Sequence, residues 1–64
     1  MFTKQELATL LGALQFWSEE IVPHGDDLAR PYLDEVGLAG IQPLALAEIQ
    51  RLADRLRDLT ALAE

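Results

Sequence analysis

The sequence contains no cysteine and only one histidine. The lack of cysteine excludes disulfides and thiolate metal sites together, and a single imidazole is too few for a histidine-rich metal centre. A chain of 64 residues buries only about 60% of its unfolded surface, so its stability as one small domain (residues 1–64) is marginal. Small proteins usually compensate with disulfides, a metal or oligomerisation. Oligomerisation is the option that remains.

Basic residues are scarce as well. Five Lys and Arg stand against eleven Asp and Glu, and the net charge is −6. Residues 1–22 hold one basic and three acidic residues, residues 23–42 one and four, and residues 43–64 three and four. Since no segment is basic, we expect neither a nucleic-acid nor a membrane partner. The acidity fits solubility or a basic partner protein.

Long hydrophobic runs are also missing. The longest uncharged runs, residues 7–18 and 36–47, are shorter than the roughly 18 residues that a membrane-spanning helix needs. The first residues do not show the pattern of a secretory signal. We therefore expect a cytoplasmic location.

Residues 3–22 are predicted to form the first long helix. Thr3 and Glu6 have the spacing of a capping box, and Phe2 and Leu7 that of a hydrophobic staple. Pro23 should end the helix at about residue 21 or 22, because a proline disfavours helical geometry in the residue before it. Apolar residues recur every three or four positions. This stripe consists of Leu7, Leu10, Leu11, Leu14, Trp17 and Ile21.

Phe16 lies outside this stripe, among polar residues and one turn after Gly12. In one interpretation it is a single exposed aromatic residue, or one that the connector covers; isolated exposed apolar residues are common. In the other, it belongs to a second contact face, where Gly12 lets another helix approach and Phe16 anchors it.

The connector, residues 23–42, is rich in proline and glycine but too long for a simple loop between bundle helices. Leu28, Tyr32 and Val36 are four residues apart, which predicts a short helix over 28–36. Gly37 suits the left-handed conformation that often ends a helix.

Residues 43–63 are predicted to form the second long helix, with Pro43 in its first position and Gln42 as its cap. Its apolar residues have the spacing of an antiparallel bundle. They are Ala45, Leu46, Ile49, Leu52, Ala53, Leu56, Leu59 and Ala63. Leu44 and Leu62 lie off this stripe and mark further contacts. The polar face should carry ion pairs at three-residue spacing. These are Glu48–Arg51, Arg51–Asp54, Asp54–Arg57 and Arg55–Asp58.

An acidic turn follows the first helix. Its polar residues are Glu19, Glu20, His24, Asp26 and Asp27. They match neither the ligand spacing of di-iron bundles nor that of EF-hands. The simpler interpretation is a solvated helix end, with Asp26 or Asp27 capping the short helix. Because two acidic residues in a last turn oppose the helix dipole, a bound metal or small cation remains an alternative.

No side chains have the pattern of a catalytic site. His24 lies in a Pro-His-Gly turn without an evident partner to orient it, and no glycine-rich phosphate loop is present. We therefore expect a protein without catalytic residues, enzymatic activity or cofactor.

These patterns predict an all-α fold. Two long helices form an antiparallel hairpin with a short helix in the connector, and two chains dimerise into a four-helix bundle. The alternative is a monomer in which the short helix covers the hairpin through Leu28, Tyr32, Leu33 and Val36.

Two functions follow from this fold. The first is a homo-oligomeric protein–protein interaction or structural module, with a partner-binding surface at Phe16, Gly12, Leu44 and Leu62. The second is a metal or small-cation binding protein that uses the acidic turn.

Overall fold

A hairpin of two long helices forms the body of the protein, and a short helix projects from its base. The computed structural model describes residues 1–38 and 40–63. In chain order, the elements are α1 (Lys4–Phe16), the π-helical turn η1 (Trp17–Ile21), the 3₁₀ turn η2 (Val22–His24), α2 (Asp26–Glu35) and α3 (Leu46–Leu62).

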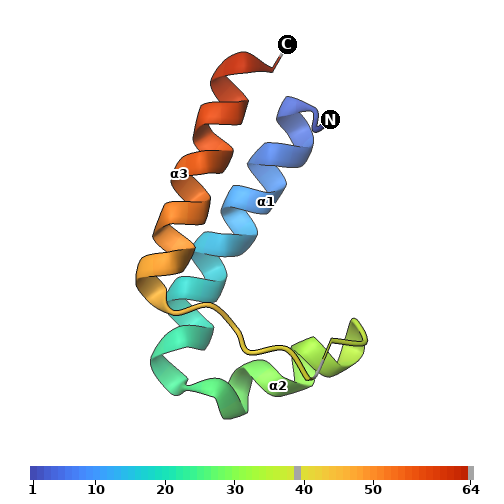
Figure 1. Ribbon diagram of the computed structural model, residues 1–64, viewed down its shortest axis with the longest axis vertical. Coiled ribbons are helices and arrows are strands. Elements are labelled where there is room, and N and C mark those ends of the chain that lie inside the picture. The colour runs from blue at the N-terminus through green and yellow to red at the C-terminus, as the bar shows by residue number, and fades with distance from the viewer. Residues whose placement is uncertain (39, 64) are drawn as a thin grey trace.

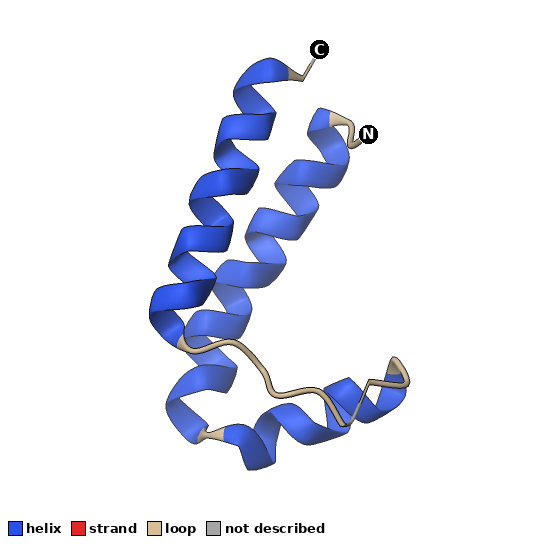
Figure 2. Ribbon diagram, viewed as in Figure 1, coloured by secondary structure: helices blue, strands red, loops and turns tan. Residues whose placement is uncertain are grey.

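The arrangement of these elements confirms the predicted all-α hairpin with a short helix in its connector. α1 and α3 run side by side in opposite directions, so that both termini lie at the same end (Figure 1). α2 extends from the base on the side of α1 that faces away from α3. The segment after α2 then crosses back as a loop to the start of α3 (Figure 2).

The start of α1 confirms the predicted capping box. The Thr3 N–H donates to the Glu6 carboxylate at 2.7 Å, and the Glu6 N–H donates to Thr3 Oγ1 at 3.1 Å. These hydrogen bonds satisfy backbone donors that the first turn of a helix leaves without an intrahelical partner. The hydrogen bond from the Thr3 backbone N–H to the Glu6 carboxylate is the main cause that lowers the pKa of Glu6 below its ordinary value, and a hydrogen bond with the Thr3 side chain lowers it further.

Replacing the cap residue, Thr3→Ala, should destabilise the fold by about 1 kcal/mol, or roughly 4–8 °C in Tm. Thermal melts followed by circular dichroism measure this change. An unchanged Tm would show that the cap contributes nothing to stability.

The Glu6 carboxylate adds a pH dependence whose sign follows from its lowered pKa. Its contribution is complete above its unfolded-state pKa of about 4.3 and is lost as the pH falls through the lower folded-state pKa. The Tm difference between wild type and Glu6→Gln should therefore be largest at neutral pH and shrink in acid. A difference that grew in acid would contradict this assignment.

The end of α1 differs from the prediction. Regular α-helix stops at Phe16, and the chain continues through η1, where the Val22 N–H donates to the Trp17 carbonyl. Val22 keeps right-handed helical geometry although it precedes Pro23. In an α-helix, the Pro23 ring would clash with the carbonyl four residues earlier and leave it without a donor. A wider turn before the proline relieves this conflict without ending the helical path.

α2 begins two residues earlier than predicted and ends at Glu35, one residue before the predicted end. Its N-cap residue is Gly25, with φ 83°, rather than Asp26 or Asp27; both aspartates instead lie in the first turn, where the helix dipole favours them. At the other end, Gly37 takes φ 76°. The Gly37 N–H donates to the Asp34 carbonyl at 3.0 Å and the Leu38 N–H to the Leu33 carbonyl at 2.8 Å. This pair of bonds is a Schellman motif.

α3 begins at Leu46, so the predicted start at Pro43 is wrong. Ala45 is the N-cap residue, and its N–H donates to the Glu48 carboxylate at 3.1 Å. Gln42, the predicted cap, instead donates from Nε2 to Asp26 Oδ2 at 2.8 Å. This bond joins the loop before α3 to the start of α2. The residues between Gln42 and Ala45 therefore cross from one element to the other in a non-helical path.

The core is small. Among the described residues, five hydrophobic side chains are buried. They are Leu7, Ile21, Ala29, Ile49 and Leu56. Four of these belong to the predicted stripes of the two long helices, and Ala29 is added by α2. Among residues 1–38 and 40–63, no helix is long and apolar enough to cross a membrane.

Many large apolar side chains remain exposed. Beyond the first two residues, they are Leu10, Phe16, Leu28, Tyr32, Val36, Leu38, Ile41, Leu44, Leu46, Leu59 and Leu62. Leu28, Tyr32 and Val36, which the three-helix alternative places over the hairpin, are thus not enclosed by it. A single copy of the chain therefore leaves these large apolar side chains in contact with water.

Candidate functional site

The four predicted partner-binding residues are all exposed, but they do not form one patch. Gly12 and Phe16 lie one turn apart on α1. Leu44 lies in the loop before α3, and Leu62 is the last residue of that helix. Because a helix rises 1.5 Å per residue, the length of α3 separates Leu44 from Leu62 by roughly 24 Å or more. Only the α1 pair therefore forms a local surface.

Gly12 and Phe16 lie on the side of α1 that faces away from α3. Leu7 and Leu14 face the hairpin core, and Phe16 is two residues beyond Leu14, more than half a turn around the helix. Its exposed fraction is 57%. In the described structure, no atom beyond its chain neighbours and the adjacent backbone of its own helix lies within 4 Å of the position that a Cβ of Gly12 would take. This face is open to another helix.

α2 extends from the base on the same side of α1 (Figure 1). The Tyr32 ring meets the Trp17 ring edge to face, with 6.1 Å between centroids and 71° between planes. Leu28 and Val36, four residues to either side of Tyr32, share its face of α2 and are exposed. This contact holds the apolar face of α2 against Trp17, the residue that follows Phe16 at the start of η1. We call Gly12, Phe16, Trp17, Leu28, Tyr32 and Val36 the corner surface.

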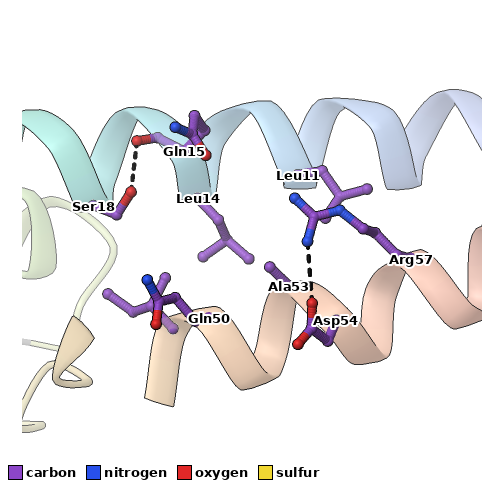
Figure 3. Close-up of a pocket in the computed structure, with 9 residues that line it drawn as sticks. Leu11, Leu14, Gln15, Ser18, Gln50, Ala53, Asp54 and Arg57 are labelled. Carbon is purple, nitrogen blue, oxygen red and sulfur yellow. Dashed lines mark hydrogen bonds and ion pairs between the residues drawn. The ribbon is translucent and has the colours of Figure 1, made fainter. Parts of the chain in front are cut away.

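The hairpin has two long sides where α1 and α3 meet, and one of them is a polar groove of about 420 Å³. Polar side chains surround its apolar floor. They are Gln15, Ser18, Gln50, Asp54 and Arg57. Ser18 Oγ donates to the Gln15 carbonyl at 2.9 Å, and Arg57 pairs with Asp54 at 3.1 Å (Figure 3). The Ser18 hydroxyl thus bonds back to the carbonyl three residues earlier in the chain.

The opposite side of the hairpin is apolar. Leu52 and Leu59 each lie two residues from a groove residue of α3, which places them on the other side of that helix. On α1, Leu10 lies five residues before Gln15, which is about 140° around the helix. Leu10 and Leu59 are exposed, and Leu52 is half-buried. We call Leu10, Leu52 and Leu59 the apolar edge.

The acidic turn is divided among three elements. Glu19 and Glu20 lie in η1, His24 in η2, and Asp26 and Asp27 at the start of α2. Glu19 accepts from Gln15 Nε2, Asp26 from Gln42, and Asp27 lies 3.9 Å from Arg30. Among residues 1–38 and 40–63, no three His, Asp or Glu side chains are grouped where they could hold a metal ion.

The charged face of α3 holds fewer ion pairs than predicted. Of the four expected pairs, only Asp54–Arg57 forms within the described part of the chain. Glu48 turns back to the helix start, where it accepts from Ala45. Across the same described residues, Arg51 and Arg55 have no carboxylate within 4.0 Å. Solvent-exposed pairs at this spacing contribute little, so their absence costs the fold little.

Comparisons with known proteins found no family model that matches the chain, and no curated protein or solved structure with significant similarity to it.

The sequence pointed to Gly12, Phe16, Leu44 and Leu62 as surface residues but assigned Leu10, Leu52 and Leu59 to the core. Leu10 and Leu59 fit the apolar stripes of their helices, yet each lies at the margin of its stripe and stays exposed. The Trp17–Tyr32 contact joins residues of different elements, and no local pattern indicates it.

Proposed function

We propose that this chain is a homodimeric protein–protein interaction or structural module, in which two copies pack their apolar edges together into a four-helix bundle. The observation that carries the proposal is the exposed apolar edge, formed by Leu10, Leu52 and Leu59 along the length of the hairpin. A hairpin with apolar side chains on one long side is half of a bundle. The second copy supplies the other half.

The size and composition of the chain favour a second copy as the partner that covers the apolar edge. The chain has 64 residues and no cysteine, so it lacks the cross-links that often stabilise small domains. Its five buried side chains form too small a core for much stability of its own. A two-fold interface uses the same surface on both copies, so one apolar edge covers the other.

Charge favours the pairing of α1 in one copy with α3 in the other. Arg51 and Arg55 flank the apolar edge on α3, and within the described residues neither has an ion-pair partner. Residues 1–22 carry one basic and three acidic residues. Opposite charges across an interface favour the correct orientation and disfavour others. The arginines of one copy would thus face the more acidic helix of the other.

Light scattering of the purified protein tests the proposal directly. The expected molar mass is twice the 7.1 kDa of one chain, and it should fall towards that value on dilution. Tm should rise with protein concentration, because dimerisation stabilises only the folded state. A mass of one chain at the highest attainable concentration would overturn the dimer.

A further inference from the structure

We propose that the corner surface binds an amphipathic helix of another protein, one that carries lysine or arginine beside its apolar side chains. This site is separate from the apolar edge and has a different kind of partner. The residues come from two helices that diverge from a shared contact, so that a third helix would touch both.

The corner surface has the composition of a helix-binding site. Three of its large side chains are about half exposed or more: Phe16, Tyr32 and Val36, at 57%, 49% and 67%. Aromatic side chains are the commonest anchors of protein interfaces. Trp17, which is half-buried, fixes Tyr32 by the edge-to-face contact at 6.1 Å. The site therefore has an aromatic centre with apolar residues on both sides.

Gly12 defines where the partner approaches α1. In the described structure, no side chain or other element comes within 4 Å of its Cβ position apart from its chain neighbours, and the residue is exposed one turn before Phe16. A position without a side chain lets a partner backbone come close, as small residues do at tight helix crossings. An incoming helix can thus pass over Gly12 and place its apolar residues against Phe16, one turn further along α1.

The charges around the corner surface select a basic partner. Glu19 and Glu20 follow Phe16 by three and four residues, and Asp34 and Glu35 lie beside Val36. Residues 1–42, which form both helices of the corner, hold seven acidic residues against Lys4 and Arg30. The other three basic residues belong to α3, which lies across α1 from α2 (Figure 1).

The same charges disfavour a second copy at this site. Two corner surfaces facing each other would bring acidic residues against acidic residues, which is repulsive. A helix with basic residues beside its apolar stripe has the opposite charge and the matching apolar face. Binding of this kind is a known mode of recognition, in which an amphipathic helix packs its apolar face on an apolar surface.

A synthetic peptide provides the test. The probe has leucine at the a and d positions of three heptads, lysine and alanine elsewhere, and no tryptophan, so that Trp17 is the only tryptophan in the sample. A matched peptide with glutamate in place of lysine is the charge control. Titration of the full chain should give a saturable change in Trp17 fluorescence with the lysine peptide and none with the glutamate peptide. Added salt should weaken the binding.

Variants locate the binding to the corner surface. Phe16→Ala and Val36→Ala lie on different helices and are exposed, so both should keep the wild-type circular dichroism spectrum and weaken peptide binding at least roughly tenfold. Leu62→Ala, an exposed leucine at the far end of α3, should bind as wild type does. Equal binding by all variants, or by both peptides, would overturn the proposal. So would a peptide that halves the molar mass of a dimer, because it would then occupy the apolar edge.

Discussion

Replacing Leu7 by alanine is expected to lower the free energy of unfolding by about 2–5 kcal/mol. Leu7 is 1% exposed and is the most completely buried large side chain of the described residues. A chain of 64 residues has a total stability of about 3–10 kcal/mol. The cavity left by this one substitution therefore removes a large part of the stability, and the variant should be partly or fully unfolded at room temperature.

Urea unfolding followed by circular dichroism measures the effect. Leu62→Ala is the matched control, because the same atoms are removed from a side chain that is 82% exposed. Its free energy of unfolding should change by no more than about 0.5 kcal/mol. Equal stabilities for the two variants would show that Leu7 is not the centre of the core.

A charge in the apolar edge, Leu59→Asp, is expected to convert the dimer into a monomer. In a single copy Leu59 is 46% exposed, so the aspartate stays in water and costs the isolated hairpin little. Between two copies the same side chain would be buried without a partner, and burying a charge in this way costs several kcal/mol. The two-fold axis repeats that cost on both sides of the interface.

The molar mass of Leu59→Asp should therefore equal one chain at concentrations where the wild type is dimeric. Ala61→Asp is the matched control, since Ala61 is exposed and lies two residues from Leu59, on the opposite side of α3, so the same charge there should leave the mass unchanged. A Leu59→Asp protein with the wild-type mass would place the dimer interface elsewhere, or show that none exists.

The parts of the fold that the sequence predicted correctly depend on neighbouring residues. The capping box needs only Thr3 and Glu6, and the Schellman motif needs a glycine at residue 37 after a helical segment. The two apolar stripes supplied four of the five buried side chains. In each case the determining interaction spans a turn or two of helix, so its pattern is visible in a short stretch of sequence.

The parts that it did not predict depend on residues far apart. Gln42 bonds to Asp26, sixteen residues earlier, and this bond accompanies the late start of α3. The Trp17–Tyr32 contact fixes how α2 meets α1, and so decides which apolar residues gather at the corner. Helical spacing assigns a residue to a face, but it does not reveal whether another element covers that face.

The molecule has two parts that differ in how readily they open locally, namely α2 and the α1–α3 hairpin. Most of the buried side chains belong to the hairpin, and α2 contributes Ala29. The Trp17–Tyr32 contact and the Gln42–Asp26 hydrogen bond also hold α2 in place. Breaking those few contacts releases α2 without separating the hairpin. Opening of this kind needs much less free energy than global unfolding, and backbone amides of α2 would exchange with solvent long before those at the centre of the hairpin. A helix bound to the corner surface would slow amide exchange in α2 and so reduce the difference in exchange rate between α2 and the hairpin.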